Sequence, residues 1–344
     1  MNKDFMESLD PETMDLNKLQ NTKILITGAN GLIASNLAEA LYLLGEKYNI
    51  ELYLLCRNKE KAEKRFSYIL RSPRVHLLIQ DVVEPLNLDL EFDYIFHAAS
   101  SAHPGAFNTV PADVMKANFI GTMNLLDYCK GKKARFIFVS SSEVYGENFE
   151  GVEYFDENMN GSVNPTVFRS CYPESKRASE TLCMCYKKQY DSDVVVVRPA
   201  FIYGREILDS NIRADVYFLR QVLNHEDIVM YSKGDQIRSY LYVNDCVSAM
   251  MIAALKGENG EVYNIGNDEN IITLHDYAKT LADIGGVKLI YQPETKPEGV
   301  KFLKTTRCAL KADKLKKLGW TIEYSLEDGV KDILNPAMHL SEMQ

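Results

Sequence analysis

The sequence predicts an α/β protein with a doubly wound parallel sheet, followed by a smaller C-terminal α/β domain. Short, continuously apolar runs alternate with helical segments through residues 21–200, a glycine turn follows the first run, and the alternation loosens after Arg198. Continuous apolar runs are typical of strands buried on both faces. The helices between them supply the crossovers that parallel strands need.

The strands and helices of the first part follow in order from Lys23. We expect strands at residues 23–27, 51–55, 75–79, 94–98, 136–139 and 194–197, and helices at 32–44, 59–70, 114–129 and 174–190. Because every helix in this series separates two buried strands, both faces of the sheet should be covered.

The remaining chain is assigned by the change in its pattern. Residues 201–344 are expected to form mainly the smaller, substrate-binding domain, with helices near 219–223, 249–255, 274–284 and 312–318 and strands at 228–231 and 288–291. Residues 1–20 are expected to be an N-terminal arm, either disordered or packed on a neighbouring molecule. The polar segment 146–169 is either a lid or a surface excursion.

Composition limits the classes of function. Of the 344 residues 46% are hydrophobic, and the net charge of −9 opposes broad attraction to nucleic acids or membranes. The seven cysteines show no CxxC zinc spacing, so we expect free thiols in a reducing compartment and no metal site. No apolar run approaches the roughly 18 residues of a membrane span, and no signal-peptide core is present, so we expect a cytoplasmic protein.

The turn at residues 27–34, Thr-Gly-Ala-Asn-Gly-Leu-Ile-Ala, has the form of a dinucleotide-binding loop. Its two glycines allow a tight turn and let a pyrophosphate approach the N–H groups at a helix N-terminus. Such glycines also occur in plain turns, but their place at the first strand–helix junction favours a nucleotide site and a Rossmann domain over residues 21–200. The expected cofactor contacts here are Gly28, Asn30, Gly31, Leu32 and Ile33.

The end of the second strand bears on which cofactor is bound. An acidic residue that binds the adenosine ribose is typical at this place, but the chain has Cys56-Arg57-Asn58. Arg57 either pairs with a 2′-phosphate, which would indicate NADP, or lies over the adenine or in solvent. Asp81, after the third strand, is an adenine contact or a strand-end cap. We expect NAD, with NADP as the alternative.

Tyr172 and Lys176 are the candidate catalytic pair. Four residues apart on one helix, they share a face. A tyrosine is a poor base at neutral pH, with a pKa near ~10, but a nearby ammonium favours the phenolate. The phenolate could then remove a hydroxyl proton while hydride passes to the cofactor. Serines 140–142, at the carboxyl end of the strand before this helix, lie where open parallel sheets bind ligands.

Taken together, these motifs resemble those of an extended short-chain dehydrogenase/reductase of the nucleotide-sugar epimerase/dehydratase kind, across residues 23–320. The resemblance implies that Ser141 orients the reacting oxygen, Tyr172 is the base and Lys176 contacts the nicotinamide ribose. It implies a homodimer and a nucleotide-sugar substrate, with Arg238 on the diphosphate. The matching segments are residues 27–33, 93–99, 118–126, 140–146, 172–176, 198–199, 238–245, 263–266 and 318–320.

The resemblance also assigns further contacts. Substrate contacts are expected from His103, in the segment where related enzymes meet the sugar, and from Arg169 beside the tyrosine. Besides the glycine turn and the catalytic pair, the expected cofactor contacts are Arg57, Asp81, Val82, Ala98, Ala99, Ser100, Asn118, Ser140 and Pro199.

The residues after Ser141 bear on the reaction. Ser142 and Glu143 resemble the pattern of UDP-glucuronate decarboxylases, whereas 4,6-dehydratases have an Asp-Glu acid–base pair here. Oxidation at C4 would create a β-keto acid that loses carbon dioxide, after which the same cofactor returns its hydride. Glu143 would assist ring movement or proton delivery. The alternatives are a 4-epimerase, a 4,6-dehydratase, an NADPH-dependent ketoreductase or a non-catalytic nucleotide-sensing regulator.

Several positions depart from the family pattern. Phe201 stands where an asparagine usually touches the substrate diphosphate, and the expected Tyr-Gly-Pro reads Tyr203-Gly204-Arg205-Glu206. These changes concern substrate contacts and leave the redox residues in place.

Overall fold

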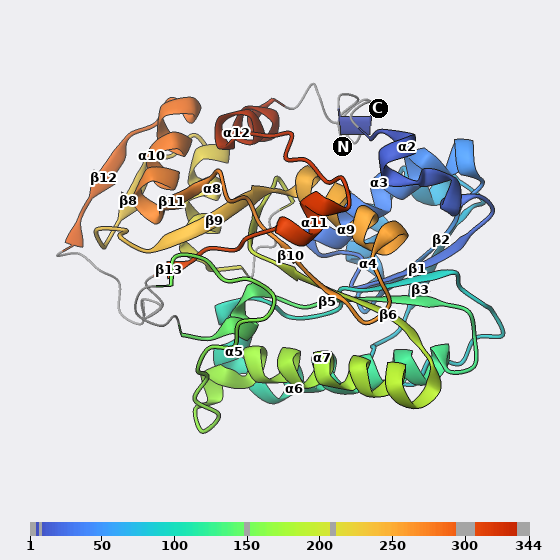
Figure 1. Ribbon diagram of the computed structural model, residues 1–344. Helices are drawn as coiled ribbons and strands as arrows, with labels where there is room; N and C mark the ends of the chain where they lie inside the picture. Colours follow the sequence, from blue (N-terminus) through green and yellow to red (C-terminus); the bar gives the residue numbers. More distant parts are fainter. Residues whose placement is uncertain (1–4, 7–8, 148–151, 207–210, 294–306, 336–344) are drawn as a thin grey trace.

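The computed structural model describes residues 5–6, 9–147, 152–206, 211–293 and 307–335. Its centre is a seven-stranded parallel sheet in the order β10-β6-β5-β4-β1-β2-β3 (Figure 1). The order reverses between β1 and β4, which is where doubly wound sheets bind ligands. The strands are β1 (Lys23–Thr27), β2 (Glu51–Cys56), β3 (Val75–Ile79), β4 (Tyr94–His97), β5 (Arg135–Val139), β6 (Asp193–Pro199) and β10 (Val262–Ile265).

Helices cover both faces of this sheet, which confirms the predicted fold class (Figure 1). Alternate residues of β1 enter different cores: Ile24 and Ile26 pack in one buried cluster, while Leu25 packs in another. Burial of both faces is the reason the strands are continuously apolar. The helices of this layer are α3 (Leu32–Tyr48), α4 (Lys59–Arg65), α5 (Pro104–Thr109), α6 (Pro111–Cys129), α7 (Cys171–Tyr190) and α9 (Val243–Lys256).

The second part of the molecule is built around β9 (Ile237–Tyr242), which pairs in parallel with β7 (Phe201–Tyr203) and β13 (Arg307–Cys308) and antiparallel with β11 (Ile271–Thr273). A separate ribbon joins β8 (Ile228–Met230) to β12 (Leu289–Tyr291). The accompanying helices are α8 (Ala214–Leu223), α10 (Leu274–Gly285), α11 (Asp313–Lys317) and α12 (Leu326–Leu334).

The chain crosses between the two parts more than once. After β9, helix α9 returns to pack on α3, and β10 becomes the edge strand of the seven-stranded sheet beside β6. A boundary near residue 200 therefore does not separate two continuous segments. Strand β7 begins two residues after β6 ends at Pro199, so β7 and its partner β9 continue from the carboxyl end of β6.

The described part of the N-terminal arm packs on its own chain. Helix α2 (Pro11–Met14) contacts α9, and Phe5 and Leu16 are buried in the main core. Lys18 Nζ donates to the Leu255 carbonyl over 2.7 Å. The described residues of this arm are therefore ordered, because their apolar side chains are buried in the core of the same chain. The alternative of packing on a neighbouring molecule stays a prediction.

Two further expectations change in detail. The helix expected at 59–70 is divided into α4 and a 3-10 turn, Ile69–Arg71. In the polar segment 146–169, Phe155 is buried against Tyr145, with ring centroids 4.7 Å apart, and bridges to Leu310. This part of the segment is packed rather than extended into solvent, while residues 148–151 lie outside the described chain.

Candidate active site

The glycine turn lies against the end of β4. Gly28 has φ +64°, and a Cβ added to it would lie 2.5 Å from Ala99 Cα. Gly31 is the N-cap of α3, whose N-terminus therefore opens at this turn. Only glycine fits this left-handed position and close approach, and a helix N-terminus favours an anion such as a pyrophosphate.

Buried polar atoms beside the turn fit a polar ligand. Asn30 Oδ1 and Ser100 Oγ are buried and have no hydrogen-bond partner within the described chain. Buried groups of this kind normally have a partner. Together with the Gly28 approach to Ala98 and Ala99, they are compatible with a bound dinucleotide.

Cys56 and Arg57 have different surroundings at the end of β2. The Cys56 thiol is buried under the glycine turn, and this burial raises its pKa to about 11, opposed by N–H groups of Asn30 and Ala29. Arg57 is 63% exposed and forms a 3.5 Å ion pair with Asp81. The two residues proposed to contact the adenosine therefore pair with each other across neighbouring strand ends.

Tyr172 and Ser141 meet at the carboxyl end of β5. Burial raises the pKa of Tyr172, and Glu143 raises it further, while a hydrogen bond with Ser141 and the charges of Arg213 and Arg169 lower it. The ring stacks on Phe107 with centroids 5.0 Å apart. The phenol is thus held in a fixed orientation beside the serine hydroxyl.

Lys176 lies beneath this pair. Its Nζ donates to the Val139 carbonyl over 2.7 Å and lies 5.9 Å from the centroid of the Tyr172 ring. The side-chain cations that lower the pKa of Tyr172 are Arg213 and Arg169. The positive charge of a bound nicotinamide ring would lower this pKa further. The shared helix face was expected from the sequence, whereas the main-chain partner of Lys176 was not.

Burial lowers the pKa of Lys176 to about 7 from its ordinary value of 10.5, although Glu180 opposes the shift. Between these two values the unfolded chain holds a proton that the folded chain has released, so stability should rise with pH across this window. We expect the free energy of unfolding of the wild type, relative to Lys176→Met, to increase from below pH 7 toward pH 10. Urea unfolding of both proteins at several pH values measures this difference.

Lys187→Met, which removes an exposed lysine of the same helix, is the matched control for loss of a lysine. A wild-type-minus-Lys176→Met difference that stays flat or falls with increasing pH would contradict the assignment.

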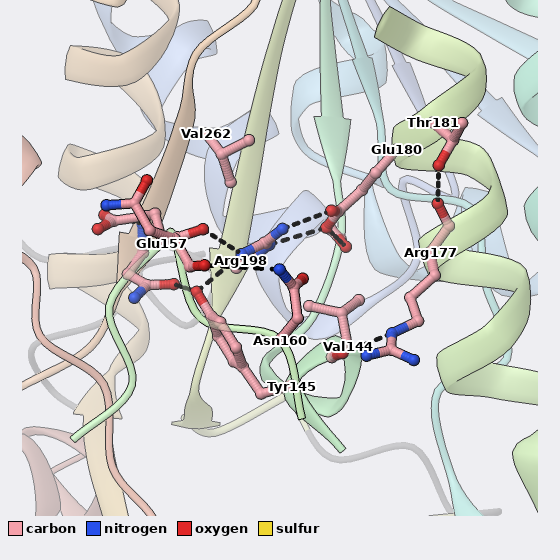
Figure 2. A network of polar contacts seen from close by, with 12 residues as sticks. Val144, Tyr145, Glu157, Asn160, Arg177, Glu180, Thr181, Arg198 and Val262 are labelled. Atoms are coloured by element: carbon pink, nitrogen blue, oxygen red, sulfur yellow. Dashed lines mark hydrogen bonds and ion pairs between the residues drawn. The ribbon is translucent and has the colours of Figure 1, made fainter. Parts of the chain in front are cut away.

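Ser140 belongs to a buried polar network rather than facing the cofactor turn. Its hydroxyl donates to Glu180 over 2.5 Å. Glu180 in turn forms a two-pronged ion pair with Arg198, with distances of 2.7 and 3.0 Å (Figure 2). Arg198 also donates to the Tyr145 hydroxyl over 2.9 Å. The network joins α7 to β5 and β6 behind Ser141, so the proposed cofactor role of Ser140 would have to be exercised by its main chain.

A cavity of about 240 Å³ adjoins this network but is separate from the catalytic pair. Neither Tyr172 nor Ser141 lines it. Its walls are Val144, Met159, Asn160, Arg177, Glu180, Thr181 and Arg198, several of which are drawn in Figure 2. Tyr172 and the glycine turn, neither of which contributes to these walls, mark the active site instead.

Glu143 and Arg169 form an ion pair of 3.0 Å beside the tyrosine. The Arg169 guanidinium also lies 4.5 Å from the Phe107 ring centroid, and Phe107 in turn stacks on Tyr172. A carboxylate and a guanidinium are thus both held at the expected site of reaction, and each is only partly exposed.

Ser142 faces a different group. It is buried and hydrogen-bonds the thiol of Cys308 on β13. Arg238 is also buried, and its guanidinium lies 5.0 Å from the Phe201 ring centroid. The substitution of asparagine by Phe201 therefore places an aromatic ring against Arg238.

Arg213 is a site residue that sequence reasoning missed. Its guanidinium carbon lies 5.0 Å from the centroid of the Phe201 ring and it forms an ion pair with Asp215. Its positive charge lowers the pKa of Tyr172. It stands in a polar stretch without a recognised motif, so only its position in space connects it with the tyrosine.

The other predicted contacts have structural partners. His103 caps α5, with Nδ1 accepting from the Ala106 N–H over 3.3 Å, and burial lowers its pKa. Asn118 is buried between α6 and α7, where its amide donates to Ser175 over 2.8 Å. Val82 packs against Gly121, and Pro199 ends β6 opposite Ile265. Within the described residues, no cluster of three or more potential His, Cys, Asp or Glu ligands could hold a metal.

The family model described as NAD dependent epimerase/dehydratase family matches residues 24–266. UDP-glucuronic acid decarboxylase 2 of Arabidopsis thaliana is 31% identical over 91% of this chain and 67% of its own length. UDP-glucuronic acid decarboxylase 1 of Xenopus tropicalis is 31% identical over 96% of this chain and 74% of its own length.

Solved structures agree on the fold. UDP-glucose 4-epimerase of Thermotoga maritima with UDP-glucose has a TM-score of 0.75 at 25% identity, covering 91% of this chain and 97% of that one. dTDP-glucose 4,6-dehydratase of Bacillus anthracis in complex with NAD has a TM-score of 0.76 at 23% identity, covering 91% and 95% of the two chains.

Proposed function

Because this chain belongs to the NAD dependent epimerase/dehydratase family, we propose that it oxidises a nucleotide sugar at C4 with bound NAD and decarboxylates UDP-glucuronate. The observation that supports this most directly is the hydrogen-bonded pair of Tyr172 and Ser141, with the Glu143–Arg169 ion pair beside it. The similarity to UDP-glucuronic acid decarboxylases extends over nine-tenths of the chain or more.

The chain's own residues divide the proton chemistry between them. Ser141 would hydrogen-bond the C4 oxygen, and Tyr172 would take its proton. The dinucleotide would lie on the Gly28–Gly31 turn, with Asn30 and Ser100 as partners, and when bound it supplies a hydride acceptor that later returns the hydride. Its positive nicotinamide would favour the phenolate that burial of Tyr172 opposes.

Residues 142 and 143 favour decarboxylation over dehydration. Loss of water needs an acid as well as a base, but Ser142 is no acid and is buried against Cys308. Decarboxylation of a 4-keto uronate needs no acid to release carbon dioxide, because the adjacent ketone accepts the electrons. Glu143 would then assist return of a proton to C5 or movement of the ring.

A net NADPH-dependent ketoreductase is the second candidate, and Arg57 is the observation that favours it. Its exposed guanidinium could bind a 2′-phosphate, but that phosphate would have to displace or share Arg57 with Asp81. A bound NAD needs no such exchange. We therefore propose NAD as the cofactor.

Mass spectrometry of products from a panel of UDP-, dTDP-, CDP- and GDP-sugars tests the proposal. With UDP-glucuronate we expect loss of one carbon dioxide and no net change in cofactor absorbance. Loss of water or an unchanged mass with an inverted centre would replace decarboxylation by dehydration or epimerisation. Stoichiometric consumption of NADPH would instead establish the ketoreductase.

We propose that the enzyme is a homodimer. Met115 and Phe119, one turn apart on α6, are 44% and 37% exposed and would provide apolar contacts between copies. Light scattering should give about twice the 39.1 kDa chain mass, and a monomer would refute the proposal.

A cytoplasmic location is also proposed. All seven cysteines lie in the described residues and are free thiols, which suits a reducing compartment. No helix in the described ranges is long and apolar enough to cross a membrane. Cell fractionation would test the location, and recovery in an oxidising compartment would contradict it.

A further inference from the structure

Glu206 follows Arg205, which stands in place of the family's proline, and it links the second part of the molecule to the glycine-turn helix. It lies just after β7, in the loop where the family motif has its Tyr-Gly-Pro. Its carboxylate accepts from Asn36 Nδ2 of α3 over 2.9 Å and pairs with Arg65 of α4 at 3.3 Å. One side chain therefore joins its own loop to two helices of the first part of the chain.

Glu206 is not needed to neutralise the charge between α3 and α4. Arg65 already pairs with the buried Glu39 at 2.6 Å, so α3 and α4 satisfy each other's charges. Burial raises the pKa of Glu39, but the neighbouring positive charge of Arg65 brings it below its ordinary value. Glu206 is a second carboxylate that pairs with the Arg65 guanidinium. Its contact therefore attaches the loop after β7 to the two helices.

The α3 contacts lie within its first five residues, Leu32–Asn36, directly after the glycine turn. Asn36, besides donating to Glu206, donates to the Leu32 carbonyl over 2.8 Å. Gly204 of the same loop packs on Leu32 as well, since a Cβ there would lie 2.9 Å from Leu32 Cδ1. Two independent contacts thus fasten the loop to the helix that would hold the pyrophosphate.

We propose that Glu206, with Arg65 and Asn36, forms a clasp that retains the dinucleotide through successive turnovers. Helix α4 follows Arg57 at the adenosine side, so the clasp spans both helices that flank the expected binding site. The inference rests on the proposed function, because an enzyme that reoxidises its own NADH must keep the cofactor bound. Glu206 is a positioning residue that acts through α3 and α4.

The test is the rate at which purified holoenzyme exchanges bound NAD for isotopically labelled NAD, followed by mass spectrometry. Glu206→Ala should release NAD about five- to twentyfold faster, since it loses a partly buried ion pair and a charge-assisted hydrogen bond. Glu206→Gln keeps an acceptor for Asn36, so its rate of NAD exchange should lie between those of the wild type and Glu206→Ala. The control is Glu63→Gln, which breaks the exposed Lys59–Glu63 pair on α4, the helix that carries Arg65. This variant should exchange NAD at the wild-type rate.

Thermal unfolding of the cofactor-free proteins separates the clasp from general loosening. The Glu39–Arg65 pair survives in both Glu206 variants, so their cofactor-free Tm should stay within a few degrees of wild type. Wild-type exchange in Glu206→Ala, or equal acceleration in Glu63→Gln, would overturn the clasp alone. A wild type that binds no NAD would overturn the proposed function and the clasp together.

Discussion

Tyr172→Phe is expected to reduce turnover about a thousandfold or more while the chain stays folded and still binds its cofactor. The change removes only the hydroxyl that would take the C4 proton. The Phe107 stacking can persist, because a phenylalanine ring fills the same volume. Product formation by mass spectrometry, together with bound NAD and Tm, measures the three quantities separately.

Tyr186→Phe is the matched control. It lies on the same helix, and its hydroxyl donates to Asp127 over 2.9 Å, far along α7 from the carboxyl edge of the sheet. We expect nearly wild-type turnover from it. A Tyr172→Phe enzyme that kept more than about a tenth of the activity would remove the tyrosine from its role as base.

Gly28→Ala is expected to abolish NAD binding and lower the free energy of unfolding by more than about 2 kcal/mol. The added Cβ would enter the main chain at Ala98 and Ala99, and φ of +64° strains any L side chain. Neither neighbour is a flexible side-chain end that could move aside. Urea unfolding and calorimetric titration with NAD measure the two losses.

Gly131→Ala separates strain from collision. Gly131 also has positive φ, +75°, but a Cβ there would meet nothing within 4 Å. It should lose only about 1 kcal/mol and bind NAD normally. Equal losses in the two variants would show that the approach of Gly28 to β4 is not what makes glycine necessary.

Much of the fold could be predicted because the relevant signals are local. A strand such as Val194–Val197 is continuously apolar since both of its faces are buried. Strands after residue 200 were harder to predict: β9 of the second part and β10 of the main sheet were identified by motif but not as strands. Their pairing depends on β7, β11 and β6, which lie far away in the sequence.

Among the site residues, those whose relation depends on spacing within one element could be predicted: the Gly28–Gly31 turn and the Tyr172–Lys176 helix face. Helical and turn geometry act over a few residues, so spacing is sufficient there. The partner that each side chain meets, by contrast, follows from how the elements pack against one another. This packing turned Ser140 toward Glu180, paired Arg57 with Asp81 and brought Arg213 near Tyr172. Such contacts depend on how separate elements pack, and a local sequence pattern does not give the distance between residues on different elements.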